Sequence, residues 1–254
     1  MQAQGTALRP YLADLHVHTV LSPCAEVEMI PPLIVARARE LALGVIAVTD
    51  HNSAENAAAV IEAARGFELT VLPGMEVQTR EEVHLVCLFD TVEQALDWQE
   101  CVYAHLPSLK NREDYFGAQF VVDSTGEYVR SNERLLLTST SLSVGEAARG
   151  VHERGGLCIP AHVDRPAFSL LANLGFVPQD VQWCAMEVSH QADVEQLRSK
   201  HPSLRGYACI SSGDAHRLEE ISDRTVLTIE QPSVAEIAMA FKGLNGRRVK
   251  VLSR

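Results

Sequence analysis

The sequence predicts an α/β fold in which helices cover a largely parallel sheet. Short apolar runs of strand character alternate with segments of helical spacing in the first half of the chain, which is typical of βαβ units. Histidine and carboxylate residues recur directly after several of these runs, as in α/β barrels whose sites lie at the carboxyl ends of the strands. The length of 254 residues is ordinary for one barrel domain. Residues 1–254 are therefore interpreted as a single domain.

The composition indicates a globular protein with a sizeable core. Hydrophobic residues make up 46% of the chain and charged residues 22%. No apolar run approaches the roughly 20 residues that span a bilayer, and residues 1–6 lack the layout of a signal peptide. The six cysteines form no CxxC pair and lie mostly in apolar runs, as free thiols do in a reducing compartment. We expect a cytoplasmic protein without a membrane partner.

The formal net charge of −11 bears on the kind of partner. Proteins that bind long polyanions depend on Lys and Arg patches, and the only short basic run is Arg247–Lys250. The charge therefore predicts a small ligand and makes nucleic acid an unlikely partner. Nothing in the sequence indicates an oligomeric state.

The first predicted strand, Tyr11–Ala13, leads into Asp14-Leu15-His16-Val17-His18. Side chains two residues apart on a strand point to the same face. His16 and His18 can therefore present two imidazoles to one metal ion. Asp14 is a candidate for orienting one of these histidines.

The next segments continue the alternation. A helix is expected from Pro31, which is tolerated in a first helical turn, to a stop at Gly44. The buried strand Val45–Val48 then delivers Asp50 and His51, and a second helix over 54–65 precedes a strand over 69–72.

The pattern changes after Glu76. Too few residues separate Met75–Val77 from the apolar run Val83–Phe89 to hold a crossover helix, so an antiparallel hairpin is predicted. This geometry places Glu76 and His84 at the same end of the sheet.

The second half alternates less regularly. A helix is expected over 91–105, and residues 106–141 are interpreted as an insertion near the site mouth, with a hairpin about Ser124–Gly126. Ser143 and Glu146 form a capping-box signature for a helix ending near Arg154. The remaining predicted elements are strands at 157–161, 184–188, 207–211 and 249–252 and a helix beginning after Ser233. The strands at 157–161 and 207–211 deliver His162 and the pair Asp214 and His216.

Imidazole and carboxylate donors suit zinc, manganese or iron, and several carboxylates allow one to bridge two ions. His105, His152 and His201 lie in helix-like or turn contexts and are interpreted as structural or solvated. His190 follows a predicted strand and could face the site.

Five motifs together resemble the PHP (polymerase and histidinol phosphatase) family of metal-dependent phosphoesterases. They are Asp14–His18, Thr49–His51, Gly74–Val77 with His84, His162–Arg165 and Ser212–His216, and they occur in the family order. The resemblance covers residues 12 to about 220. It implies a distorted (β/α)7 TIM-like barrel, with the 106–141 insertion, that holds two or three divalent ions.

The resemblance also implies roles for individual residues. His16, His18, Glu76 and Asp214 correspond to ligands of one ion, with Glu76 as the bridge to a second ion held by His51 and His84. His162 and His216, with His18 or Asp214, could serve a third ion, and Asp50 is a further candidate ligand. Arg165 matches a phosphate-binding arginine, whose planar fork suits phosphate oxygens. Glu76, Asp214 and Arg165 are therefore the candidate catalytic residues.

Cys24 is where the chain departs from the family pattern. Many members place a histidine or aspartate five or six residues after the second histidine of the first motif, where this chain has Pro23-Cys24. Cys24 could replace that ligand as a thiolate, which would favour zinc or iron over manganese, or the contact could be absent.

The resemblance implies hydrolysis of a phosphate ester by a hydroxide that bridges two ions. The favoured substrate is a small phosphorylated metabolite or a nucleotide. The alternatives are a nuclease or exonuclease acting on single-stranded nucleic acid and a metal-stabilised regulatory module without catalysis. No Walker motif indicates ATP-driven chemistry.

Overall fold

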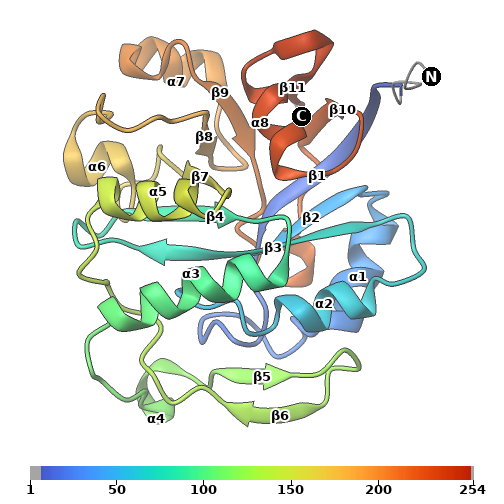
Figure 1. The fold of residues 1–254 in the computed structure, drawn as a ribbon, viewed down its shortest axis with the longest axis vertical. Helices are drawn as coiled ribbons and strands as arrows, with labels where there is room; N and C mark the ends of the chain where they lie inside the picture. Colours follow the sequence, from blue (N-terminus) through green and yellow to red (C-terminus); the bar gives the residue numbers. More distant parts are fainter. Residues whose placement is uncertain (1–6, 253–254) are drawn as a thin grey trace.

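The computed structural model describes residues 7–252, and helices pack on a strongly curled sheet (Figure 1). The sheet has seven strands in the order β11-β10-β1-β2-β3-β4-β7. Their bounds are β1 Arg9–Val17, β2 Val45–Val48, β3 Thr70–Gln78, β4 His84–Leu88, β7 Leu157–Pro160, β10 Thr225–Ile229 and β11 Arg248–Val251. Two separate pairs are β5 (Phe120–Val122) with β6 (Tyr128–Ser131) and β8 (Ala185–Val188) with β9 (Ala208–Ser211).

The strand directions confirm the predicted parallel βαβ units and the hairpin, although four of the six pairings in the seven-stranded sheet are antiparallel. β1, β2 and β3 are parallel, β4 is antiparallel to both β3 and β7, and β8 is parallel to β9. The segment after β9 returns to β1, where Val17 and Ala215 form a parallel bridge and the His18 amide donates to the Ala215 carbonyl at 3.0 Å. This contact curls the strands into a distorted TIM-like barrel.

Eight α-helices lie in the described part of the chain. They are α1 (Pro31–Glu40), α2 (Ala57–Ala63), α3 (Val92–His105), α4 (Glu113–Phe116), α5 (Val144–Glu153), α6 (Leu170–Leu174), α7 (Val194–Lys200) and α8 (Val234–Phe241). The capping box expected at Ser143 is present, because its hydroxyl accepts from the Glu146 amide at 3.3 Å. None of the helices within 7–252 combines the length and the apolar character needed to cross a bilayer. The signal-peptide expectation concerns residues 1–6, which lie outside the described residues.

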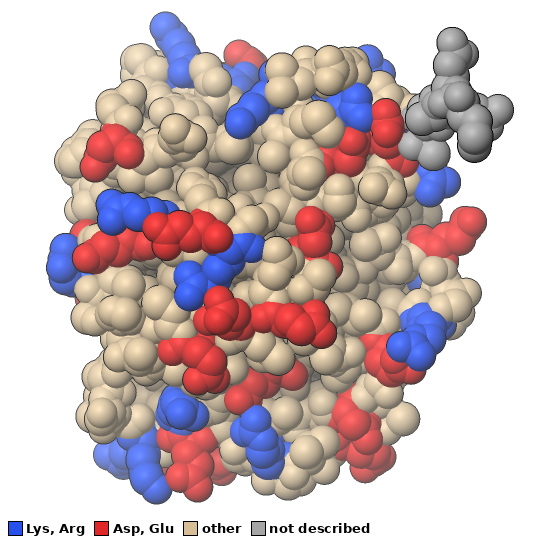
Figure 2. Space-filling model, viewed as in Figure 1, with Lys and Arg blue, Asp and Glu red and all other residues tan. Residues whose placement is uncertain are grey.

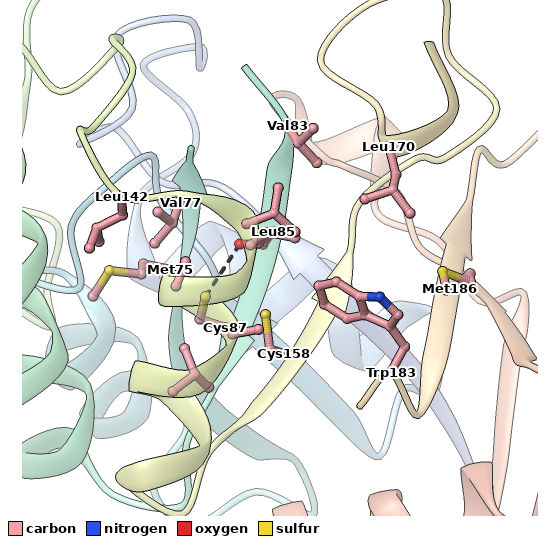
Figure 3. Packing of buried hydrophobic residues seen from close by; sticks show 14 of the residues in the cluster. Met75, Val77, Val83, Leu85, Cys87, Leu142, Cys158, Leu170, Trp183 and Met186 are labelled. Carbon is pink, nitrogen blue, oxygen red and sulfur yellow. Dashed lines mark hydrogen bonds between the residues drawn. The ribbon is translucent and has the colours of Figure 1, made fainter. Parts of the chain in front are cut away.

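The core fills both faces of the sheet. One cluster inside the barrel includes Leu15, Ala47 and Ile159. A second cluster packs β3, β4 and β7 against α3 and α5, and Figure 3 shows Cys87 and Cys158 side by side within it. These two cysteines are buried and unpaired, as the apolar context predicted.

The 106–141 segment packs beside the loops that follow β1 and β2. The Phe120 amide donates to the Val20 carbonyl at 3.0 Å, and Asn52 Nδ2 donates to the carbonyls of Leu136 and Thr138 at 2.8 Å. In Figure 1, α4 and the β5–β6 hairpin lie at the lower edge of the molecule, below α3. The insertion therefore borders the carboxyl ends of β1 and β2.

Strand β10 was not predicted. It pairs antiparallel with β1 over Arg9–Ala13 and with β11 on its other side. β10 pairs along the part of β1 that precedes His16 and His18, and neither β10 nor β11 contributes a residue to the groups of possible metal ligands in residues 7–252.

Candidate metal centre

Eight side chains predicted as metal ligands converge at one end of the barrel. β1 carries His16, the loop after β2 carries His51, and β3 and β4 carry Glu76 and His84. The loops after β7 and β9 deliver His162, Asp214 and His216, and His18 follows β1. Between Asp14 and Val17, β1 has one residue more than β2, a bulge of the kind that re-aims side chains beside active sites.

Glu76 lies at the centre of this cluster and is 1% exposed. Its Oε1 lies 2.8 Å from His84 Nδ1, 3.2 Å from His162 Nε2 and 3.3 Å from His16 Nε2. Its Oε2 lies 2.9 Å from His51 Nδ1 and 3.5 Å from His18 Nε2. One carboxylate thus contacts five imidazoles, and its two oxygens face different histidines, as in a carboxylate that bridges two ions.

His16, His18, Glu76 and Asp214 form the first group that could hold an ion. The Nε2 atoms of His16 and His18 lie 3.2 Å apart, and both lie 3.1–3.5 Å from oxygens of Glu76 and Asp214. Two ligand atoms bound at zinc distances to one tetrahedral ion are about 3.3 Å apart. The spacing of the four side chains therefore fits coordination of a shared ion.

Two further groups adjoin the first. His51, Glu76 and His84 form one and His18, His51 and His216 the other, with ligand atoms within 4.8 Å of one another. Glu76, His18 and His51 each belong to two groups, so neighbouring ions could share a ligand. His162 lies outside these groups, although its ring is 5.4 Å from that of His84.

Unsatisfied polar atoms provide a separate test of metal binding. His84 Nε2 and His162 Nδ1 are buried without a hydrogen-bond partner. Such atoms are costly in a protein interior and commonly mark the place of an ion or a water. Neutral imidazole nitrogens and carboxylate oxygens are the donors that divalent transition metals prefer. The residues present therefore fit divalent ions.

The electrostatics keep the two carboxylates ionised. Burial raises the pKa of Glu76, but His84, His16 and His51 outweigh it and hold the pKa well below its ordinary value. Burial also raises the pKa of Asp214, which His16 and His18 bring well below the ordinary range. For His18, burial together with His216 and His51 lowers the pKa, which favours the neutral, ligating imidazole.

The backbone is strained where two of these residues leave their strands. His162 has φ 30° and Asp214 has φ 49°, a region that residues with side chains rarely adopt. Gly213 precedes Asp214, and a Cβ on it would lie 2.3 Å from the Glu220 carbonyl oxygen. Local strain of this kind clusters at functional sites, where the surrounding structure maintains it.

The PHP domain family model matches residues 14–173, which is more than half of the chain. The chain belongs to the PHP domain family. The expected resemblance is therefore confirmed, and PHP domain proteins are metal-dependent hydrolases.

Two similar proteins act on nucleic acid. The 5'-3' exoribonuclease Rnm of Escherichia coli K12 is 28% identical over 180 residues, covering 68% of this chain and 58% of that protein. The lesion-specific endonuclease EndoQ of Pyrococcus furiosus has a similar fold, with a TM-score of 0.67 at 20% identity, covering 95% of this chain and 58% of the other. This chain thus spans less than two thirds of both proteins.

A third neighbour matches over most of its own length. The metal-dependent phosphoesterase of Bifidobacterium adolescentis, described as putative, has a TM-score of 0.51 at 18% identity, with 81% of this chain and 87% of that chain covered.

The expectation that nucleic acid is an unlikely partner is wrong. Rnm is an exoribonuclease, and Endonuclease Q has been solved with a 27-mer duplex substrate. The inference failed because a net charge describes the whole surface, whereas divalent ions reverse the field locally around carboxylates.

Glu187 is a site residue of this PHP domain that the sequence analysis did not identify. Its Oε2 lies 2.9 Å from His16 Nδ1 and accepts from the His162 amide at 3.1 Å, and it is 2% exposed. Fixing the proton on Nδ1 leaves His16 Nε2 free to face Glu76 and Asp214. The position of Glu187 one residue before the end of the predicted strand 184–188 was the only available signal.

We expect Glu187→Gln to weaken metal binding by roughly ten- to a hundredfold, because the amide cannot supply the negative charge that makes His16 a stronger ligand. Chelator competition measures the affinity, and thermal unfolding of chelated protein checks the fold. An unchanged affinity in a normally folded variant would contradict the orienting role.

Asp50 and Asp14 were both predicted at the site, but they accept hydrogen bonds from groups other than the histidine rings. Asp50 accepts from the Thr19 amide, the Thr19 hydroxyl and the Ser22 hydroxyl, each at 2.7 Å, and lies outside the three groups. Asp14 accepts from the amides of His16, Gly213 and Ser222 at 2.7–3.2 Å. Asp14 therefore connects the end of β1 to the loop after β9 through backbone amides. Within residues 7–252 it makes no hydrogen bond to a histidine ring nitrogen, so the predicted orienting contact is not observed.

His190 lies away from the cluster, whereas Arg165 reaches it. His190 is exposed and lines a surface cavity of about 1090 Å³ beside α7, α8 and β11, outside the three groups. Arg165 reaches the centre, where its Nη1 donates to Asp214 Oδ2 at 2.5 Å. Its side chain remains 41% exposed, so part of the guanidinium faces solvent.

Cys24 lies beside the metal centre but outside the three groups. Burial raises the pKa of its thiol, but hydrogen bonds with His216 and His51 outweigh this and lower the pKa to about 6. The residue as a whole is exposed, so a reagent can approach it. Its role as a ligand stays a prediction.

We expect metal loading to protect Cys24 from alkylation. In chelator-treated protein at pH 7 the thiol is mostly thiolate and should react readily, whereas a bound ion would cover it. Mass spectrometry compares alkylation at Cys24 in both states, with half-buried Cys101 as the internal reference. Equal rates in both states, together with unchanged metal affinity of Cys24→Ser, would exclude ligation.

Proposed function

We propose that this protein is a metal-dependent phosphoesterase that hydrolyses phosphate esters at the ends of single-stranded nucleic acid. The observation that carries the phosphoesterase assignment is Glu76 in contact with five histidines, next to Asp214 and Arg165. A phosphate ester needs charge neutralisation at its oxygens, and this end of the barrel concentrates groups that provide it.

The side chains of the centre have different roles in this reaction. When bound, divalent ions polarise the phosphoryl oxygens and lower the pKa of water. Glu76 and Asp214 supply the negative charge that holds the ions, and Glu187 fixes the orientation of His16. Arg165 can turn part of its guanidinium from Asp214 to the phosphate and bind two oxygens at once, which stabilises the charge that develops on phosphorus.

The insertion supports nucleic acid as the substrate. Single-stranded nucleic acid is bound by aromatic side chains interspersed with cations. On α4, Tyr115 is 75% exposed, and the guanidinium of Arg112 lies 5.5 Å from its ring centroid. A Cβ on the following Gly117 would lie 2.6 Å from the Pro23 carbonyl oxygen, so this segment packs against the loop that carries Cys24.

A small phosphorylated metabolite is the second candidate substrate. Figure 2 shows Asp and Glu side chains spread over one face with Lys and Arg interspersed among them, so this face carries no continuous cationic surface. A small substrate would need only the ions and Arg165, without an extended cationic surface.

Elemental analysis and a substrate screen test the proposal together. We expect at least two divalent ions per chain in protein prepared without chelator. We also expect metal-loaded protein to release nucleotides from a single-stranded oligonucleotide faster than it dephosphorylates nucleotides, sugar phosphates or histidinol phosphate. Metal content near zero that zinc, manganese or iron does not restore would refute the metal centre. Preference for a small phosphate ester would favour the second candidate.

A further inference from the structure

Phe168 is an aromatic residue at the metal centre that the proposed chemistry does not use. Its ring stacks on the imidazole of His84, with centroids 4.9 Å apart and planes inclined by 22°. The residue is nevertheless 43% exposed. One part of the ring therefore covers a predicted metal ligand while another part is open to solvent.

The backbone holds this ring in an unfavourable conformation. Phe168 has φ 55°, which is a genuine outlier for a bulky side chain. The His84 amide donates to the Phe168 carbonyl at 3.0 Å, so the strained residue is fixed to β4. Conformations of this kind persist only where neighbouring contacts maintain them, and they concentrate at ligand-binding positions.

Hydrogen bonds also fix the other parts of the loop between β7 and α6, which carries Phe168. Ser189 donates to both carboxylate oxygens of Asp164, through its amide at 2.8 Å and its hydroxyl at 2.5 Å. The buried hydroxyl of Ser169 donates to the Arg165 carbonyl at 2.7 Å and accepts from the Ala172 amide, which caps α6. Phe168 is thus held rigidly three residues from the arginine that we assign to phosphate.

We propose that Phe168 forms a nucleobase-stacking subsite, which binds the base of the nucleotide whose phosphate lies at the metal centre. This inference rests on the proposed function, and it adds a residue that selects nucleotides over other phosphate esters. A rigid aromatic ring stacks on a base at little entropic cost, and such contacts tolerate any base because each has a flat π-face. His84, Phe168 and the base would form a continuous stack, with Arg165 beside the phosphate.

The test uses metal-loaded protein and short oligonucleotides that carry 2-aminopurine at either end, whose fluorescence falls when it stacks. Matched oligonucleotides carry an abasic residue in the same position. Phe168→Leu keeps the apolar cover of His84 but removes the π-face, and Phe168→Trp restores it. Phe67→Leu is the control, because Phe67 is also 43% exposed but precedes the amino end of β3.

We expect wild type, Phe168→Trp and Phe67→Leu to quench 2-aminopurine, and Phe168→Leu to lose the quenching. In cleavage assays Phe168→Leu should raise KM for the base-bearing end roughly ten- to a hundredfold, with kcat, metal content and the rate on the abasic substrate little changed. A loss that is equal for the base-bearing and abasic substrates would overturn the subsite, because Phe168 would then act only through His84.

The two proposals fail in different ways. Quenching by wild type and Phe168→Trp without any cleavage would refute the nuclease function and leave the stacking subsite in place. Cleavage at the wild-type rate by Phe168→Leu, or no quenching by wild type at either end, would refute the subsite and leave the nuclease function in place.

Discussion

Replacing Glu76 by glutamine is expected to abolish most of the activity and to reduce the metal content. The substitution keeps the size of the side chain, but it removes the one negative charge that faces five imidazoles. An amide is also a poor bridge between two cations, because only one of its two polar atoms has lone pairs to offer. We expect the turnover to fall by at least about a hundred- to a thousandfold, with loss of at least one ion per chain.

Elemental analysis and steady-state kinetics on the same preparation measure both effects. Glu236→Gln is the matched control, because Glu236 is also buried and also bound to a cation, with Arg247 Nη2 2.8 Å from its Oε1, but it lies on α8. Thermal unfolding in the presence of chelator separates a folding defect from metal loss. Retention of both activity and metal within a few-fold would show that a different carboxylate bridges the ions.

Substitution of Arg165 should separate substrate binding from metal binding. Arg165→Gln removes the charge, and we expect kcat/KM to fall by about a hundred- to a thousandfold, as for other groups that stabilise developing charge. Arg165→Lys should recover only part of this, because an ammonium cannot bind two phosphate oxygens with a planar fork. Metal content should stay unchanged, since a guanidinium is not a ligand.

Arg154→Lys is the control for the Arg165 series. Arg154 also pairs with an aspartate, with its Nε 2.6 Å from Asp97 Oδ2, and it lies next to α5 and away from the cluster. If Arg165→Gln loses metal in proportion to activity, Arg165 acts by supporting Asp214 and not by binding phosphate. Wild-type kinetics for Arg165→Gln would remove Arg165 from the catalytic site altogether.

Most of the fold follows from local sequence patterns. The short apolar run Val45–Val48 and the capping signature at Ser143 each predicted an element that the structure contains. The brief connection after Gln78 predicted the β3–β4 hairpin and, through it, the proximity of Glu76 and His84, which lie 2.8 Å apart. Strand β10 was not predicted because its partner β1 lies more than 200 residues earlier in the sequence. No local pattern in either segment indicates that pairing.

The site was partly predictable for a similar reason. His16 and His18 are neighbours on one strand, so their joint presentation is a local property of the backbone. The role of Glu187 is not local, since its carboxylate contacts His16 across 171 positions of the sequence. Glu187 lies near the end of a predicted strand, but its run has ordinary strand character, and that position alone does not distinguish a buried carboxylate from an exposed one.

By itself the sequence determined the fold class, the order of the ligand motifs and the chemistry of their donor atoms, because these depend on residue type and on short-range spacing. Only the tertiary structure decided which donors meet. It placed Glu76 between five histidines, directed Asp50 to Thr19 and Ser22, and left His190 outside the cluster. The physical reason is that coordination and stacking depend on distances of a few ångströms between side chains from different strands. Those distances are fixed when the barrel closes, through contacts such as the Val17–Ala215 bridge.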